Sequence, residues 1–436
     1  MGGRVDEAGG ATGGAPPAPS GARLPRALHP LRYREFRLLA SSAAASLLAD
    51  GLWLVAMVWE VIALGGGPTD LSLVAAGTSL GLVAAVLLGG VAADRLPRRA
   101  VLLVVETVRT AVPVAAGALA LTGVLQVWSL AALALVVGAA GGFYYPLWSA
   151  VVPTLLPEGE LLAANGIEGT LRPLAQQAAG PALAGLIVGV AAPGVALLGA
   201  GVAYLVALLP LLAMRPVPRP AADGAAPPSA VRQFVEGLAY LRRTGWLFAT
   251  LAFACLYILV VMGPIEVLLP FAVRDRAGGG PAGLSLVLAA YGVGSAVGAL
   301  AVSSWRLPRR YLTVMLLCWG LGALPMLAFG LSTVLWVMVL ASLAVGVTDA
   351  AAIVIWGTLL QRRVPAHLLG RVSSLDFFVS LALMPLSMAL AGPVGERVGI
   401  PLTFVVAAVV PPVLAVVAIL AWRLPRDEVA HPLDRA

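Results

Sequence analysis

The sequence predicts an all-α integral membrane protein. Its 436 residues are 60% hydrophobic and only 11% charged, with a mean hydropathy of +0.96, whereas soluble domains carry about 25% charged residues. The apolar residues form long continuous runs, each near the roughly 20 residues that a helix needs to cross the hydrocarbon core. A transmembrane barrel would instead show alternating segments of about 10 residues.

Twelve such runs can be counted, six on either side of a polar stretch. The first six are 36–64, 71–93, 100–122, 127–150, 161–190 and 193–214, and the second six are 245–272, 282–303, 311–331, 333–358, 372–394 and 399–422. We therefore expect 12 transmembrane helices arranged as two six-helix halves, 35–214 and 245–422.

The segments outside the two halves are polar or rich in Gly, Ala and Pro. Residues 1–34 lack the apolar core of a signal peptide, so we expect a disordered tail, and residues 423–436 form a short C-terminal tail. The linker 215–244 begins Pro-rich, and Phe234, Leu238 and Leu241 share one face at helical spacing. This spacing predicts an amphipathic helix at 231–242 that lies at the membrane surface.

The positions of the basic residues predict the orientation. All 28 are arginine. If both termini are cytoplasmic, 23 arginines fall in inner segments, three (Arg274, Arg276 and Arg397) fall in outer segments, and two (Arg109 and Arg172) fall inside spans. Because cytoplasmic loops of membrane proteins are enriched in arginine and lysine, we expect both termini to be cytoplasmic.

Two landmarks repeat between the halves. The tetrapeptide Arg-Leu-Pro-Arg occurs four times, always at an expected cytoplasmic border, and its two inner copies begin at Arg95 and Arg306, 211 residues apart. Gly180-Pro181 and Gly392-Pro393 are 212 residues apart. Two landmarks at nearly the same offset indicate duplicated halves, an arrangement typical of transporters with a central binding site.

The composition excludes several kinds of chemistry. Without lysine there is neither a Gly-Lys-Ser/Thr phosphate-binding loop nor a Schiff base. Cys255 and Cys318 lie in apolar runs, the three histidines are scattered, and no loop carries Asp-x-x-Asp. We therefore expect no enzyme activity, no metal site and no cofactor, and no nucleic acid among the partners; a membrane-embedded enzyme is the remote alternative.

Charged residues inside spans are expensive and are therefore candidates for function. Five carboxylates have no basic residue one helical turn away: Asp50, Glu60, Glu266, Asp349 and Asp376. Asp50 and Asp349 lie in the middle of their spans, so we expect proton coupling or binding of a cationic substrate there. Glu60 and Glu266 are candidates for the same role nearer the outside, and Asp376, near the inner border, is a candidate gating residue.

Two further pairs can neutralise themselves. Glu106 and Arg109 are three residues apart, and Glu168 and Arg172 are four apart, so each pair shares a helix face. We expect a structural or gating role for these pairs, with substrate or proton handling as the alternative. The adjacent amides Gln176-Gln177 are candidates for lining a substrate cavity.

The loop at 90–99 resembles the signature Gly-x-x-x-Asp-Arg-x-x-Arg-Arg of the major facilitator superfamily. The matching residues are Gly90, Asp94, Arg95, Arg98 and Arg99. The resemblance implies a cytoplasmic gate in which the aspartate meets the N-terminal end of span 11, where the helix dipole favours a carboxylate. In the second copy a tryptophan stands at the position of the aspartate, so we expect the latch only in the first half.

The fifth span resembles a motif of drug/proton antiporters in that superfamily. The match is Gly180-Pro181 followed by Gly185, while Gln176 stands where a glycine is usual and Ala184 replaces one of a glycine pair. The physical role of such a motif is close helix packing with a kink at proline.

Over residues 31–423 the chain resembles the bacterial enterobactin-exporter and macrolide-efflux group. The segments that carry this likeness are the first span with its flanks and residues 361–372. The resemblance implies a monomeric multi-pass protein of the bacterial plasma membrane that exports a small organic molecule by proton antiport through alternating access. An uptake permease, or a lipid or metabolite transporter of the same fold, is the alternative.

The gate hypothesis predicts the effect of Asp94→Asn. Loss of the carboxylate should weaken the latch, slowing turnover while leaving substrate binding largely intact. Transport rate and equilibrium binding of one exported dye, measured on the same purified variant, would test this, and a parallel loss of binding would contradict it.

Overall fold

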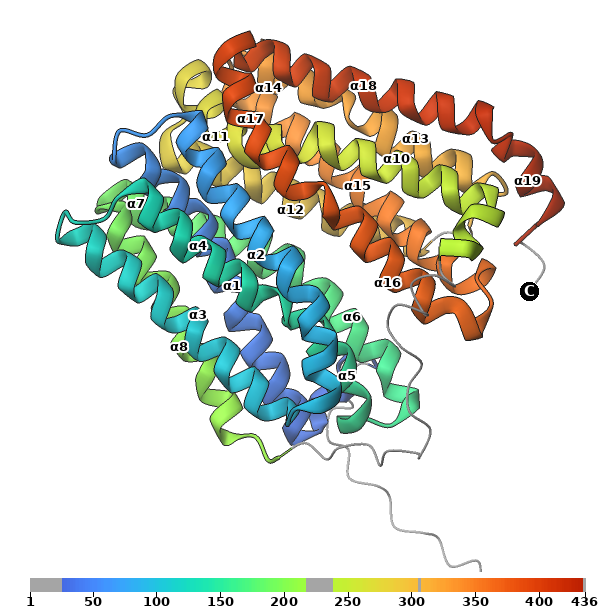
Figure 1. The fold of residues 1–436 in the computed structure, drawn as a ribbon, viewed down its shortest axis with the longest axis horizontal. Coiled ribbons are helices and arrows are strands. Elements are labelled where there is room, and N and C mark those ends of the chain that lie inside the picture. Colours follow the sequence, from blue (N-terminus) through green and yellow to red (C-terminus); the bar gives the residue numbers. More distant parts are fainter. Residues whose placement is uncertain (1–25, 217–237, 305–306, 434–436) are drawn as a thin grey trace, which may run out of the picture.

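The computed structural model describes residues 26–216, 238–304 and 307–433. Every regular element in these ranges is a helix, which confirms the expected all-α class. Figure 1 shows two helical bundles, one formed by the first part of the chain (blue to lime green) and one by the second part (yellow to red).

The first bundle begins with a short 3₁₀-helix. Its elements are η1 (Arg26–Arg32), α1 (Arg34–Ala63), α2 (Pro68–Arg95), α3 (Arg98–Leu121), α4 (Val127–Gly142), α5 (Tyr144–Leu155), η2 (Glu158–Glu160), α6 (Leu161–Leu171), the π-helix η3 (Arg172–Ala179), α7 (Gly180–Val190) and α8 (Pro193–Ala213). α6, η3 and α7 follow one another without a break and act as one long helix.

The second bundle ends in a short helix beyond its last long one. Its elements are α10 (Gly245–Gly263), η4 (Pro264–Leu268), α11 (Leu269–Phe271), η5 (Ala272–Arg276), α12 (Gly280–Ser304), α13 (Tyr311–Gly322), η6 (Leu324–Met326), α14 (Leu327–Leu331), α15 (Leu335–Arg363), α16 (Ala366–Ala382), α17 (Met384–Val398), α18 (Ile400–Ala421) and α19 (Leu424–Ala430).

Eleven helices in the described ranges are long and apolar enough to cross a membrane. The expected fourth run, 127–150, is divided at Phe143 into α4 and α5, and its apolar helix Val127–Gly141 is shorter than the others. The arrangement of 12 spans as six plus six therefore stays a prediction.

Two expectations for the flanking segments change. The tail expected to be disordered as far as residue 34 is helical from Arg26, because η1 packs on the first bundle and brings the His29 ring within 3.9 Å of Glu160. Of the expected linker helix 231–242, residues 238–243 are helical. The preceding part of the linker, with Phe234, and residues 1–25 lie outside the described ranges.

Glycines bring the helices of each bundle into backbone contact. A Cβ added at Gly81 of α2 would lie 2.1 Å from a carbonyl oxygen of α4, and one at Gly138 of α4 would lie 1.9 Å from a carbonyl oxygen of α2. The same packing joins α12 and α15, where Gly294 and Gly346 would bring a Cβ to 2.2 and 2.3 Å from the facing carbonyls. Small residues at such crossings replace the hydrophobic driving force that lipid does not provide.

The two bundles are hydrogen bonded to each other at the end remote from η1 and α19. The bonded pairs are Thr69 with Glu396 (2.9 and 2.7 Å), Ser72 with Gly392 (2.7 Å), and Pro181 with Ser285 (2.7 Å). From this seam the helices of the two bundles diverge towards the ends that carry η1 and α19 (Figure 1).

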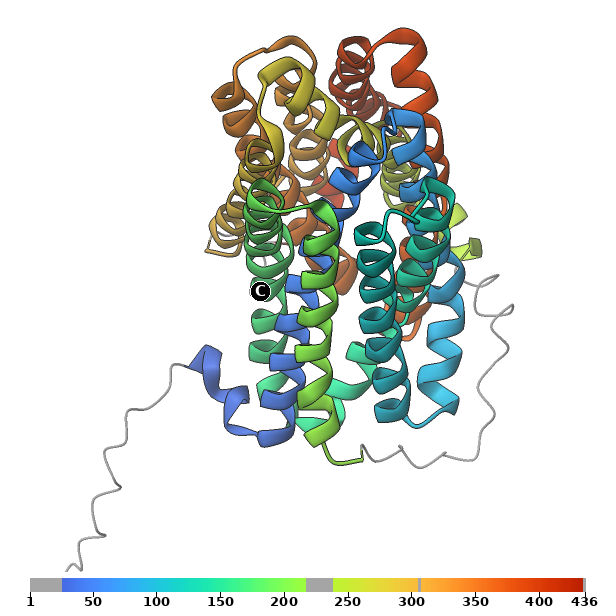
Figure 2. The same cartoon turned by 90° about the vertical axis from the view of Figure 1, so that its left-hand side faces the viewer.

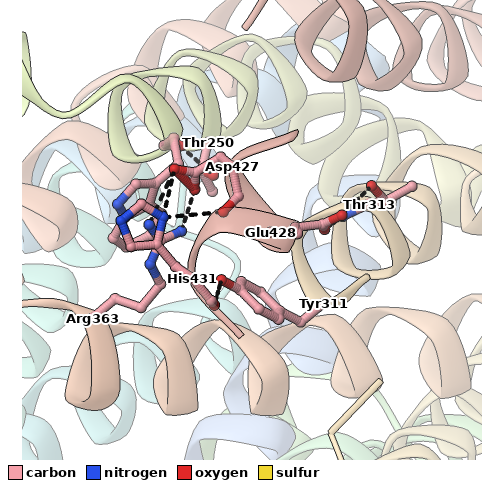
Figure 3. A network of polar contacts seen from close by, with 8 residues as sticks. Thr250, Tyr311, Thr313, Arg363, Asp427, Glu428 and His431 are labelled. Carbon is pink, nitrogen blue, oxygen red and sulfur yellow. Dashed lines mark hydrogen bonds and ion pairs between the residues drawn. The ribbon is translucent and has the colours of Figure 1, made fainter. Parts of the chain in front are cut away.

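The C-terminal helix α19 is held against the second bundle by hydrogen bonds and an ion pair (Figure 3). The Arg363 guanidinium donates to both oxygens of Asp427, at 2.5 and 3.2 Å, and lies 4.7 Å from the centre of the Trp246 ring. The buried Glu428 carboxylate accepts from the backbone N–H and the hydroxyl of Thr313 at 2.6 and 3.1 Å. α19 therefore ties together the ends of α10, α13 and α15.

The glycine contacts predict that Gly138→Leu is destabilising. The added side chain would have to displace the backbone of α2, and overpacking of this kind costs about 1–3 kcal/mol or more. We expect the thermal unfolding midpoint in detergent to fall by about 5 °C or more. Gly189→Leu is the matched control, because a Cβ at Gly189 meets no atom within 4 Å; equal midpoints for the two variants would contradict the packing account.

Candidate functional site

Asp50 lies at the centre of a polar cluster inside the first bundle. Its carboxylate on α1 accepts hydrogen bonds from the Arg109 guanidinium of α3 and the Tyr204 hydroxyl of α8. The guanidinium also lies 4.9 Å from the centre of the Tyr204 ring. The side chain of Asp50 is 18% exposed and that of Arg109 only 6%. This largely buried ion pair therefore joins α1 and α3, and Tyr204 adds α8.

The structure corrects the expectation that Arg109 neutralises Glu106 and leaves Asp50 without a partner. Arg109 is 3.8 Å from Glu106 but in direct contact with Asp50. The Ser46 hydroxyl joins the two, since it accepts from Arg109 at 2.8 Å and donates to Glu106 at 2.8 Å. One guanidinium therefore serves two carboxylates, and within the described residues the second oxygen of Glu106 is buried without a hydrogen bond.

A chain of polar side chains extends from this cluster towards the end of the bundle that carries η1. Arg172 lies 2.9 Å from Glu168 and donates to Gln176 at 3.1 Å, and the Gln176 amide donates to Asp50 at 3.4 Å. The π-helix η3 begins at Arg172, and such widened turns are frequent at functional sites. Glu168, Arg172 and Gln176 thus follow one another at four-residue spacing along the fifth expected span, and Gln176 connects them to Asp50 on α1.

Two candidate carboxylates of the second bundle, Asp349 and Asp376, have neutral partners. Asp349 on α15 accepts from the Tyr291 hydroxyl at 2.7 Å and from the Trp319 indole at 3.0 Å. Asp376 on α16 accepts from the Trp356 indole at 3.1 Å. Neither has a cation within ion-pair distance among the described residues. A carboxylate inside a membrane costs several kcal/mol unless it takes up a proton or binds a cation, so both can receive positive charge.

Three other candidates lie outside these clusters. Glu60 is buried in α1, and Glu266 is half-buried in η4. Within the described part of the chain, neither carboxylate side chain forms a hydrogen bond or an ion pair. The Gln177 side-chain oxygen is likewise buried without a partner there, and its backbone packs against Gly292 of the second bundle. No hydrogen bond or ion pair links these three side chains to Asp50 or Asp349.

Part of the gate motif lies outside the described side chains. The surroundings of Gly90 and the side chains of Asp94 and Arg95 lie outside what the structure describes, so the latch stays a prediction. Arg98 is half-buried at the start of α3. Arg99 donates to two carbonyl oxygens at the C-terminal end of α8, at 3.2 and 2.9 Å. Arg99 therefore satisfies backbone groups that a helix end leaves open.

The motif in the fifth span lies between α1 and the second bundle. A Cβ at Gly180 would lie 2.6 Å from a carbonyl oxygen of α1, and one at Gly185 would lie 2.0 Å from the Ser285 hydroxyl oxygen. The carbonyl of Pro181 accepts the hydrogen bond from Ser285. This packing holds η3, and with it Gln176, against the helix that carries Asp50.

Sequence reasoning did not identify Ser46, Tyr204 or Trp319 as members of the clusters. Tyr204 is the single tyrosine in its apolar run, and a buried tyrosine hydroxyl normally needs a partner, which was the available signal. Ser46 and Trp319 carried no comparable signal, because serine and tryptophan are ordinary residues in apolar helices and at membrane borders.

Comparisons with known proteins agree over almost the whole chain. The family described as transmembrane secretion effector matches residues 26–435. The multidrug efflux pump Tap of Mycolicibacterium fortuitum is 30% identical over 398 residues, which cover 89% of this chain and 95% of the relative. Macrolide efflux protein A of Streptococcus pyogenes is 24% identical over 384 residues, 84% of this chain and 90% of the relative.

Solved structures of transporters share the fold. The nucleoside transporter NupG gives a TM-score of 0.67 at 13% identity, with 89% of this chain and 98% of that chain covered. A bacterial homologue of the human lysosomal transporter Spinster, in an inward-facing and unoccupied conformation, gives 0.65 at 15% identity, with 93% and 99% covered.

The shared guanidinium predicts a large effect of Arg109→Gln. The change leaves Asp50 and Glu106 buried without a cation, and breaking a buried pair from one side costs about 3–5 kcal/mol. Adding Asp50→Asn should restore part of the loss, because it removes one of the two uncompensated charges. The thermal unfolding midpoints of the single and double variants in detergent measure this coupling.

Arg172→Gln serves as the comparison, since the Arg172 side chain is 24% exposed and its loss should cost less. If the fall in the unfolding midpoint of the double variant Arg109→Gln/Asp50→Asn equalled the sum of the falls in the two single variants, the ion pair would be contradicted.

Proposed function

The chain belongs to the transmembrane secretion effector family of major facilitator transporters, and from that premise we propose that it exports drug-sized organic molecules by proton antiport. The named relatives that cover most of its length are a multidrug efflux pump and a macrolide efflux protein. We place the protein in the bacterial plasma membrane as a multi-pass monomer with both termini inside, in keeping with the split of 23 inner to three outer arginines.

The observation that carries the proton coupling is the position of Arg109 between two carboxylates. Asp50 holds the guanidinium directly, and Glu106 lies 3.8 Å from it. Protonation of Asp50 would remove its attraction for Arg109, which would then move towards Glu106. Such a pair of positions for one cation is a two-state element that a proton can bias.

The polar chain places a second titratable carboxylate, Glu168, between this element and the end that carries η1. Glu168, Arg172 and Gln176 extend from Asp50 towards the end that carries η1, which is the cytoplasmic end in the proposed orientation. A proton that moves inward releases energy from the membrane potential, about 2.3 kcal/mol per 100 mV for a full crossing. Release of the proton along this chain would reset the Asp50–Arg109 contact.

Asp349 is the proposed partner site in the second bundle. It has two neutral donors and no cation among the described residues, so a basic group of a substrate or a proton can neutralise it. The proposed cycle alternates access by rocking the two bundles. The seam at the outer end and the divergence of the helices towards the inner end (Figure 1) support an inward-facing starting state.

The test is the accumulation of a macrolide and of fluorescent dyes in cells that express the protein. We expect accumulation in wild-type cells to be several-fold lower than in cells without the protein, and a protonophore or Asp50→Asn should abolish the difference. Asp275→Asn, on an exposed side chain paired with Arg274, should retain export. Full transport by Asp50→Asn against a pH gradient would contradict the role of Asp50 in proton coupling. Higher accumulation in wild-type cells than in cells without the protein would indicate uptake.

A further inference from the structure

A cavity lies between η1, α1 and α6. Its volume is about 1120 Å³. On α1, Arg34 reaches the C-terminal end of α8, while Gly51 packs on η3 and α7. The cavity lies on another face of α1: its residues there, Arg37, Ala40 and Ser41, are three and four apart and border η1 and α6. Figure 2 shows this sector facing the viewer, with α1 visible between α6–α7 (green) and α8 (lime green) and η1 at the foot.

The lining changes from polar to apolar along the two helices. Near the starts of α1 and α6 lie the exposed Arg37 and the half-buried Glu160, whose neighbour is His29. Farther into both spans the wall carries no charge: it includes Ala40 and Ile167, and the hydroxyls of Ser41 and Thr170 donate to carbonyls of their own helices. A charged mouth at the membrane border above an apolar wall suits a ligand with a polar head and a hydrocarbon chain.

Arg37 provides a free charge at this mouth. Within the described ranges its guanidinium forms neither a hydrogen bond nor an ion pair, although Arg34, one turn earlier, pairs with Glu35. Arginine forms bidentate hydrogen bonds to phosphate, and basic residues at the border attract phospholipid headgroups. The chemistry of the mouth therefore selects a phosphate ester.

We propose that this cavity binds one phospholipid of the membrane, with its phosphate at Arg37 and an acyl chain between α1 and α6. Both walls belong to helices long and apolar enough to span the membrane, Arg34–Ala63 and Ala163–Val190, so lipid is the surrounding medium at this face. In the proposed orientation this phospholipid belongs to the inner leaflet. The lipid site itself does not depend on the proposed transport.

Two glycines of α6 give a matched pair of variants. A Cβ added at Gly166 or at Gly169 meets no atom within 4 Å, and only Gly166 lines the cavity. Gly166→Leu should fill the acyl site without disturbing the fold, and Gly169→Leu is its control. Arg37→Gln should remove the phosphate contact, and Arg32→Gln, an exposed arginine of η1 outside the lining, is the control for charge.

The experiment is native mass spectrometry of the delipidated protein titrated with phosphatidylglycerol. We expect one lipid to bind to wild type, Gly169→Leu and Arg32→Gln with similar affinity. Gly166→Leu and Arg37→Gln should each weaken this binding about tenfold or more, as the loss of a charge-assisted contact or of the apolar site would. Equal binding by Gly166→Leu and Gly169→Leu would overturn the proposal.

A competition separates the lipid from a transport substrate. A macrolide added to the lipid-bound protein should leave the lipid in place, and its displacement would make the cavity a substrate site and overturn the lipid assignment. Because the readout is bound lipid, a failed export assay would leave this result unaffected, and the two proposals can fail separately.

Discussion

The contact between Asp50 and Arg109 is the interaction on which the first bundle depends. Each charge would be costly in an apolar bundle on its own, and together they bring α1 and α3 to one point, where Tyr204 adds α8. The other polar contacts among these helices are the Ser46 bonds to Glu106 and Arg109 and the arginine bonds to carbonyls at the C-terminal end of α8. The position of the ion pair therefore fixes the register of three helices, and with it the place where Gln176 can reach the cluster.

The two bundles repeat their packing but not their charge. α2 with α4 and α12 with α15 meet through glycines in the same manner, as expected for duplicated halves. The carboxylates differ, because Asp50 has a guanidinium while Asp349 has a phenol and an indole. A duplicated scaffold of this kind gives one half a compensated charge and the other an open one, so the halves can respond to a proton in different ways.

Much of the fold and less of the site could be predicted from the sequence. Helical class and the positions of most spans follow from local apolar runs, and the Glu168–Arg172 pair follows from its spacing of four. The partner of Asp50 is 59 residues away on another helix, and a single sequence does not show which helix faces meet. The helical η1 was missed for a related reason, since it packs against Glu160, more than 100 residues away.

The seam between the bundles has a consequence for the speed of rearrangement. At Gly392 the backbone of α17 lies directly against that of α2, and an added Cβ would come within 2.2 Å of the Pro68 carbonyl. Because Gly392 has no side chain, none has to be withdrawn from a pocket at this position when the two bundles separate, and little steric resistance opposes the separation there. The rate at which the seam opens should then depend on how quickly the few hydrogen bonds there exchange partners, and each of these bonds has a Glu396, Ser72 or Ser285 side chain as one partner.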